Sequence, residues 1–214
     1  MTYRLVIFDF DGTLADTFPW FVSVLDDVAD HFNFSRLAWG DIESLRRCEA
    51  RELLKAHKVP LWKVPVIARY LKKRMALDVG KISLFNGVDN LLHRLKEQNV
   101  RVALASSNSY ENIAAIMGPE RTGQFEDFEC GASLFGKAAK LRKIVKRTGF
   151  KPGEVLCVGD EIRDITAARD ARLAFGAVSW GYTRPDALAA HQPDFLFATM
   201  EEIAESVMEP QRVG

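Results

Sequence analysis

The chain has few of the residues that bind metals through nitrogen or sulfur. Its 214 residues include three cysteines and four histidines. Cys48, Cys130 and Cys157 are scattered, odd in number and without metal-ligand spacing, and the histidines share no spacing that suggests a site. Cys157 lies in an apolar run and is expected to be a small buried thiol. Zinc-type and thiol-based functions are therefore disfavoured.

An excess of charge and a long apolar stretch are also absent. Lysine plus arginine and aspartate plus glutamate both number 29, so the formal net charge is zero. This balance gives no reason to expect a nucleic-acid or membrane partner. No apolar stretch approaches the ~20 residues of a membrane span, and residues 1–4 lead into an apolar run without a signal peptide. We expect a cytoplasmic protein, with no obligate protein partner evident.

Short apolar runs of strand length recur, each followed by turn residues and a helical pattern. They lie at 5–8, 100–105, 155–158 and 174–178, with a weaker run at 195–197. Continuous apolarity is typical of parallel strands that helices cover on both faces. Helices are expected between them, at 88–98, 109–117, 137–148 and 161–171. The pattern predicts an α/β fold with a doubly wound parallel sheet.

Residues 17–83 interrupt this alternation. They contain no convincing strand, but apolar side chains recur at helical spacing, with further helical segments expected at 41–57 and 64–77. We therefore predict a core of residues 1–16 and 84–214 and a helical insertion of residues 17–83. An insertion at this point would lie above the carboxyl ends of the strands, where open α/β sheets bind ligands.

The segment DFDGTL at 9–14 directly follows the first apolar run. Asp9 and Asp11 point the same way while the chain is extended, and two like charges so close are costly unless a cation or proton relieves them. A solvated turn is the alternative, since Asp and Gly are common turn formers. The strand before the pair, and the polar groups described next, favour metal-assisted phosphoryl transfer.

Two later segments place polar groups at strand ends. Ser106, with Ser107 and Asn108 behind it, follows the run at 100–105, where its hydroxyl can bind a phosphoryl oxygen or cap a helix. Asp160 and Asp164 follow the run at 155–158 and share one face of a first helical turn. These carboxylates suit either a metal ion or the helix dipole.

Four lysines line the expected helix at 137–148. Lys137 lies within its apolar stripe, Lys140 lies at the margin, and Lys143 and Lys146 lie on the opposite side. A positive charge near a helix N-terminus is unfavourable on dipole grounds. An inward lysine there suggests a counter-anion, so we prefer Lys137 to Lys140 as the functional lysine.

In order and spacing, these four segments resemble the motifs of the haloacid dehalogenase-like (HAD) hydrolases. The run at 178–183 and the pair at 193–194 also resemble the phosphoglycolate phosphatase-like branch. The resemblance implies a Rossmann-like core, and it makes the insertion a cap that decides specificity. Asp11 argues against the dehalogenase branch, which lacks that second carboxylate.

The resemblance also implies roles for individual residues. Asp9 would be the nucleophile that forms an aspartyl-phosphate, and Asp11 the general acid/base. The phosphate would be bound by Gly12, Ser106, Ser107 and Lys137. Oxygen donors without a matching His or Cys set favour Mg²⁺. Its ligands would be Asp9, Asp11 through its backbone carbonyl, Asp160, and Asp164 directly or through water, with Glu161 a minor candidate.

The resulting hypothesis is a Mg²⁺-dependent phosphatase for a small phosphate monoester, phosphoglycolate-like or sugar-phosphate-like. A phosphomutase of the β-phosphoglucomutase type is the first alternative, although residues 18–20 lack the His usual in that group. A phosphonatase with a Schiff-base lysine and a catalytically silent binding protein are further alternatives. In the insertion, Arg46 and Arg47 either hold an anionic leaving group or lie on a solvated helical face.

Overall fold

The computed structural model describes residues 3–36, 46, 54–55, 59–131 and 136–208. Most of the expected helix at 41–57 lies outside these residues, as do Arg47 and Cys48. No helix in these ranges combines the length and apolarity that a membrane crossing requires.

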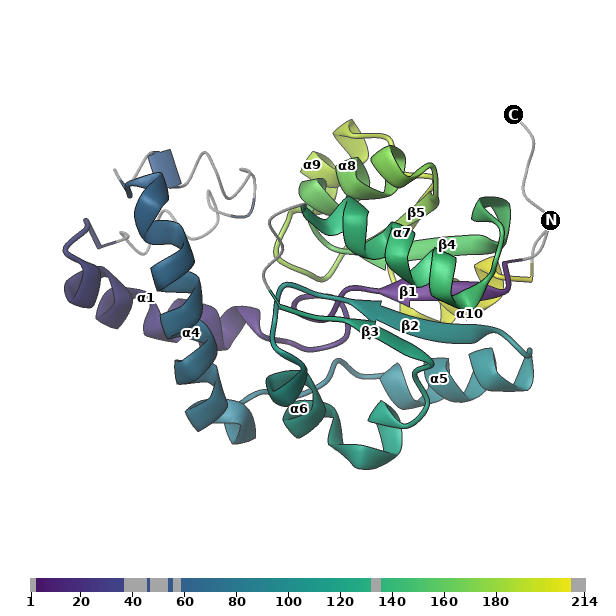
Figure 1. Cartoon of the computed structure of the whole chain (residues 1–214), viewed down its shortest axis with the longest axis horizontal. Coiled ribbons are helices and arrows are strands. Elements are labelled where there is room, and N and C mark those ends of the chain that lie inside the picture. Colours follow the sequence, from purple (N-terminus) through teal and green to yellow (C-terminus); the bar gives the residue numbers. More distant parts are fainter. Residues whose placement is uncertain (1–2, 37–45, 47–53, 56–58, 132–135, 209–214) are drawn as a thin grey trace.

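A six-stranded parallel sheet runs through the middle of the molecule (Figure 1). Its strand order is β3-β2-β1-β4-β5-β6, and β1 pairs with both β2 and β4. The chain thus builds outward from β1 first to one side and then to the other, which confirms the predicted doubly wound sheet. The strands are β1 (Leu5–Phe8), β2 (Arg101–Ala105), β3 (Asp127–Glu129), β4 (Val155–Gly159), β5 (Ala174–Val178) and β6 (Phe195–Phe197).

Helices cover both faces of the sheet, which explains why its central strands are apolar apart from the exposed Arg101 at the start of β2. Alternate residues of β1 enter different cores: Val6 and Phe8 pack with α5, α6 and α10, and Leu5 and Ile7 with α7, α8 and α9. In Figure 1, α8 and α9 lie above the sheet, and α5 and α6 below it. The bounds are α5 (Val88–Glu97), α6 (Tyr110–Thr122), α7 (Gly136–Thr148), α8 (Ile162–Ala171), α9 (Pro185–Ala190) and α10 (Met200–Ser206), with a 3₁₀ turn at Pro152–Glu154.

The helices α1 (Phe18–Phe32) and α4 (Val64–Asp78) lie beyond one end of the sheet, at the left of Figure 1. Short 3₁₀ turns at Leu61–Lys63 and Val79–Lys81 flank α4. The two helices pack together through stacked rings of His31 and Tyr70, 4.6 Å apart. The chain leaves and re-enters the core side by side, since Asp16 N donates to Ser83 O over 2.9 Å. The division into core and cap domains stays a prediction.

Some elements differ from those expected. The strand β3 was not predicted, because its three half-buried residues are too few for a pattern. The helix expected at 109–117 continues to Thr122, across a break at Gly118 (φ 77°) that is followed by Pro119. The short helices α9 and α10 were not expected either.

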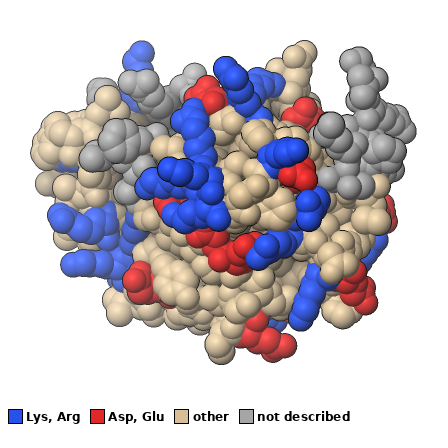
Figure 2. All heavy atoms as spheres, turned by 45° about the vertical axis from the view of Figure 1, so that its right-hand side comes forward, with Lys and Arg blue, Asp and Glu red and all other residues tan. Residues whose placement is uncertain are grey.

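Charged side chains of both signs are scattered over the face of the molecule shown in Figure 2. Lysines and arginines lie beside aspartates and glutamates over much of it. On the sheet edge, for example, Arg147 pairs with Asp127 at 2.7 Å and with Glu129 at 2.5 Å. The neutral net charge thus reflects neighbouring charges of opposite sign on this face.

Candidate active site

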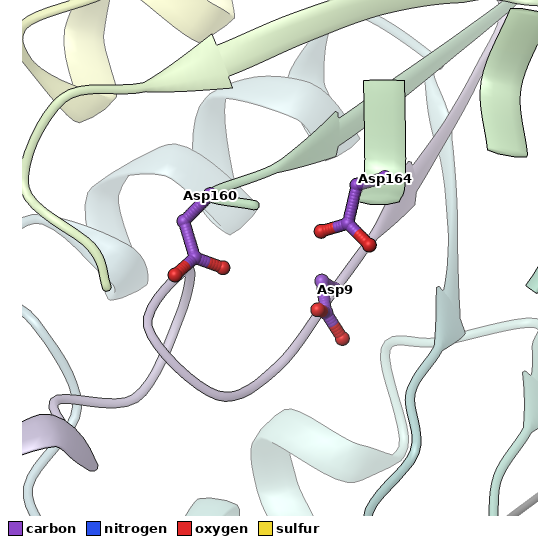
Figure 3. A group of neighbouring side chains, drawn as sticks. All are labelled: Asp9, Asp160 and Asp164. Carbon is purple, nitrogen blue, oxygen red and sulfur yellow. The ribbon is translucent and has the colours of Figure 1, made fainter. Parts of the chain in front are cut away.

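Three aspartates meet at the carboxyl ends of two adjacent central strands. Asp9 follows β1, Asp160 follows β4, and Asp164 lies in the first turn of α8. One carboxylate oxygen from each lies within 4.8 Å of the other two, and Figure 3 shows the three side chains around a common space. The strand order reverses its direction of growth between β1 and β4, the usual place for a ligand in such a sheet.

Asp9 is buried but held in its charged form by Lys137. The Lys137 ammonium lies 2.7 Å from Asp9 Oδ2, and the backbone N–H of Phe10 donates to Asp9 Oδ1 over 2.8 Å. Burial favours the neutral acid, but Lys137, with smaller contributions from Arg163 and the Phe10 N–H, outweighs it and holds the pKa of Asp9 below its usual range. The side chain is therefore a preorganised carboxylate, as a nucleophile requires.

Lys137 bridges two of the three aspartates. Its ammonium also lies 2.7 Å from Asp164 Oδ1. Burial disfavours the ammonium, but the charges of Asp164 and Asp9 outweigh it and raise the pKa of Lys137. The structure thus brings the predicted lysine to the predicted nucleophile.

Asp160 is fully buried and is fixed by two donors from distant parts of the chain. The Thr13 hydroxyl donates to its Oδ1 over 3.0 Å, and the Tyr182 N–H donates to its Oδ2 over 2.7 Å. Two glycines make room for the carboxylate: an added Cβ would lie 2.2 Å from Asp160 Oδ2 at Gly12 and 2.2 Å from Asp160 Cβ at Gly181. Gly12, at φ +74°, therefore packs against the acidic cluster.

The cluster has the properties of a cation site. Lys137 is its one direct ion-pair partner among the described residues, against three carboxylates. Burial raises the pKa of Asp160 well above its usual range and that of Asp164 to about 6. Asp164 Oδ2 is buried without a hydrogen-bond partner in the described chain. Because all three donors are hard oxygen atoms, the residues present fit Mg²⁺.

Asp11 lies beside this cluster but its side chain is not one of the three. The Asn108 amide donates to Asp11 Oδ1 over 3.2 Å. Burial, and next to it the charge of Asp9, raise the pKa of Asp11 to about 7. The pKa values of the two aspartates in the first motif are therefore shifted in opposite directions, which suits a nucleophile and a proton carrier.

Two cavities open on either side of the site. One of about 320 Å³ is lined by Asp11 and by side chains of α1 and α4, and the other, of about 570 Å³, by Asp9, Lys137 and Lys140. Ser107 lines both. Asp9 and Asp11 thus line different cavities, which share Ser107 in their walls.

The other predicted residues occupy supporting positions. Ser106 is buried, and its Oγ accepts the N–H of Asn108 over 3.1 Å. Lys140, expected at the helix margin, is instead buried, and its ammonium donates to the carbonyl oxygens of Ser106 and Gly131. Periodicity alone missed these backbone acceptors. The Glu161 carboxylate pairs with Arg163 at 2.6 Å and lies outside the three-aspartate group.

Several residues at the site were not singled out in the sequence. Thr13 and Tyr182 orient Asp160, and the Tyr182 hydroxyl lies 3.0 Å from Thr17 Oγ1. Thr13 lies within the first motif, so its position in the sequence could have indicated its role, whereas Tyr182 is 22 residues from the carboxylate that it holds.

Arg46 was one of the two cationic candidates in the insertion. It donates to the carbonyls of Tyr182 and Gly181, over 3.3 and 2.7 Å, so its guanidinium binds backbone.

Comparison with known proteins agrees with this geometry. A family model described as haloacid dehalogenase-like hydrolase matches residues 6–178. The phosphoglycolate phosphatase of Synechococcus elongatus is 31% identical over 98% of this chain and 99% of its own length. The phosphoglycolate phosphatase of Xanthomonas campestris is 26% identical over 86% of each chain.

Solved structures share the fold. A predicted phosphatase from Clostridium acetobutylicum superposes with a TM-score of 0.82 at 17% identity, over 98% of this chain and 100% of that chain. Together with the family match, this confirms the predicted fold class and family. The chain therefore belongs to the haloacid dehalogenase-like hydrolases, in their phosphoglycolate phosphatase-like branch, and is an enzyme of the phosphatase type.

Proposed function

We propose that the protein is a Mg²⁺-dependent phosphatase that hydrolyses a small phosphate monoester through a phosphoryl group carried on Asp9. The observation that carries this proposal is the placement of an ionised Asp9 against Lys137, at 2.7 Å, beside two further buried carboxylates. The names of the relatives support a phosphatase, and two of them act on phosphoglycolate by name.

In the first step, a carboxylate oxygen of Asp9 attacks phosphorus and the bond to the leaving oxygen breaks. The product is an acyl phosphate on Asp9, a mode of covalent catalysis open to carboxylates. Lys137 keeps Asp9 ionised and faces the charge on the phosphoryl oxygens. Ser107, which lines both cavities, can donate to the same group.

Asp11 would move the protons. As the neutral acid it gives its proton to the leaving oxygen, which departs as an alcohol. In the second step its carboxylate takes a proton from the water that attacks the acyl phosphate, releasing inorganic phosphate and restoring Asp9. The amide of Asn108 would hold the Asp11 side chain in place for both transfers.

The metal would be held by Asp9 and Asp160, with Asp164 close by and the backbone carbonyl of Asp11 completing the set proposed here. When bound, Mg²⁺ supplies positive charge to a phosphoryl group during transfer. Thr13 and Tyr182 orient Asp160 for this task, and such supporting contacts matter for metal affinity.

The helices α1 and α4 would form the cap over this site. Their side chains line the cavity that contains Asp11, which supports residues 17–83 as the part of the chain that selects the substrate. A cytoplasmic location, and activity without a protein, membrane or nucleic-acid partner, belong to the same proposal.

The test is phosphate release from a panel of phosphoglycolate, sugar phosphates, nucleotides and p-nitrophenyl phosphate, with Mg²⁺ or with excess chelator. We expect turnover of at least one ester that the chelator abolishes. Asp9→Asn should lose turnover by a factor of about 10⁴ or more, since it removes the nucleophile.

Control measurements separate chemistry from folding. The circular dichroism spectrum of Asp9→Asn should match that of the wild type, and the variant should still unfold in one cooperative transition. Full activity in purified Asp9→Asn would overturn the mechanism. Isomerisation of a sugar phosphate without phosphate release would instead favour the mutase.

A further inference from the structure

Lys72 brings a positive charge from α4 into the cavity on the Asp11 side. It lines the cavity of about 320 Å³ together with Asp11, and its side chain is only partly exposed. No hydrogen bond or ion pair of its ammonium occurs among the described residues. A partly desolvated cation without a partner is unfavourable unless a ligand supplies the anion.

The position of Lys72 is fixed by the core. The Asn112 amide on α6 donates to the Lys72 carbonyl over 3.0 Å. One turn further along α4, Met75 Sδ accepts the Asn108 amide at 3.1 Å. The backbone at Lys72 is therefore tied to the same loop that holds Asp11, and its side chain is aimed at the leaving-group cavity.

The other charges of this cavity are already matched. Arg163 lines it too, but its guanidinium pairs with Glu161 at 2.6 Å. Of the two cationic candidates from the sequence, Arg47 lies outside the described residues, and Arg46 does not line this cavity and donates from its guanidinium to the carbonyls of Gly181 and Tyr182. Lys72 is thus the cation in this part of the described chain that a ligand can engage.

The rest of the wall suits a short carbon chain. Phe18, Phe21 and Leu71 supply apolar surface, and a cavity of about 320 Å³ is at the small end of ligand sites. A leaving group here needs a few carbon atoms and one charged group. A polyhydroxylated sugar would bring no anion for Lys72, and only the side of the cavity with Ser107, Asn108 and Thr183 offers polar partners for its hydroxyls.

We propose that Lys72 is the residue that determines leaving-group specificity, by binding an anionic group such as a carboxylate. The substrate class is then the phosphate monoesters of small hydroxy acids. This inference rests on the proposed phosphatase function. Burial lowers the pKa of Lys72, and the charge of the Asp11 carboxyl only partly opposes that effect. A ligand anion beside the ammonium would raise this pKa again.

The test compares two esters of equal carbon count, 2-phosphoglycolate and ethyl phosphate, at saturating Mg²⁺. The wild type should prefer the carboxylate ester by kcat/KM. In Lys72→Met that preference should fall by about 10- to 100-fold, the usual worth of one charge-assisted hydrogen bond, mainly through KM. Lys72→Arg should keep most of the preference, because it keeps the charge.

Lys73→Met is the matched control, because Lys73 is the exposed neighbour on the same helix and does not line the cavity. Its kcat/KM ratio should equal that of the wild type. A wild-type ratio near one, or an unchanged ratio in Lys72→Met, overturns the role of Lys72 while the phosphatase stands. Failure to hydrolyse both esters and p-nitrophenyl phosphate would overturn the phosphatase and this inference with it.

Discussion

Asp9 and Asp11 are identical side chains two residues apart, yet their surroundings push their pKa values in opposite directions. Lys137 lies 2.7 Å from Asp9 and stabilises its charge. Asp11 forms no ion pair with a described residue, is buried, and faces the charge of Asp9, so its pKa rises to about 7. The ammonium of Lys137 therefore contributes most to the charged form of Asp9, and this difference suits the proposed roles of Asp9 as nucleophile and Asp11 as proton carrier.

The first prediction concerns proton donation by Asp11. The neutral form is the donor, so formation of the phosphoenzyme from ethyl phosphate should slow as the pH rises through about 7. The leaving group of p-nitrophenyl phosphate needs no proton, and its reaction should lack this decline. Single-turnover quench experiments between about pH 5 and 9 measure that step.

Asp11→Asn provides the check. It should slow phosphoryl transfer from ethyl phosphate by about 10²- to 10⁴-fold and from p-nitrophenyl phosphate much less. Equal losses with both esters would contradict a role in proton donation.

At the scale of single residues, the sequence predicted which side chains lie at the site better than it predicted their contacts. Lys137 was preferred because an inward lysine at a helix start needs an anion, and it does contact Asp9. Lys140 is also buried, but its partners are backbone carbonyls of Ser106 and Gly131, which no side-chain pattern reports. The sequence pattern does not indicate Lys72 either, because only the packing of α4 on α6 places its side chain in a cavity.

At the scale of elements, the central strands were predictable because burial on both faces leaves them apolar, apart from the exposed Arg101 that starts β2. All four residues of β1 are buried, and its predicted and observed ends agree. The edge strand β3 has three half-buried residues, so no run of apolar residues marks it. The placement of α1 and α4 over the strand ends depends on contacts between distant segments, which local patterns do not encode.

The contact between α4 and α6 is the basis of the second prediction. Asn112 is buried, and its amide donates to the Lys72 carbonyl over 3.0 Å and to Asn108 Oδ1 over 3.2 Å. Asn112→Ala should lower the free energy of unfolding by about 1–3 kcal/mol, because it removes both hydrogen bonds of a buried amide that joins α6 to α4. It should also raise KM, since α4 forms the cavity wall.

Asn90→Ala on α5 is the matched control. Asn90 is exposed and helical, so the same change should stay within about 0.5 kcal/mol of the wild type. Urea denaturation of both variants measures the difference. Equal stabilities would contradict the proposed docking of α4.

At the scale of the whole molecule the net charge is zero, but several carboxylates are buried close together at one site. In the metal-free protein, burial raises the pKa of Asp11 to about 7, that of Asp164 to about 6, and that of Asp160 as well. The folded state therefore binds more protons than the unfolded state above the ordinary pKa of 3.8. Its stability must fall as the pH rises from about 4 to about 7. Asp9 acts oppositely, because its lowered pKa adds stability that is lost only in acid.

The third prediction is that Mg²⁺ reverses this loss. At about pH 8 protons compete less for the carboxylates, and Mg²⁺ at about 100 times its Kd should stabilise the fold by about 2.7 kcal/mol, or about 5–10 °C in melting temperature. At about pH 5, protons compete for the same oxygen atoms, so the increase should be smaller. Differential scanning fluorimetry with and without chelator measures both. Asp160→Asn should abolish the Mg²⁺ effect and reduce the decline in stability with pH, because it removes one buried charge. An equal Mg²⁺ effect at both pH values, or one that survives in Asp160→Asn, would place the ion elsewhere.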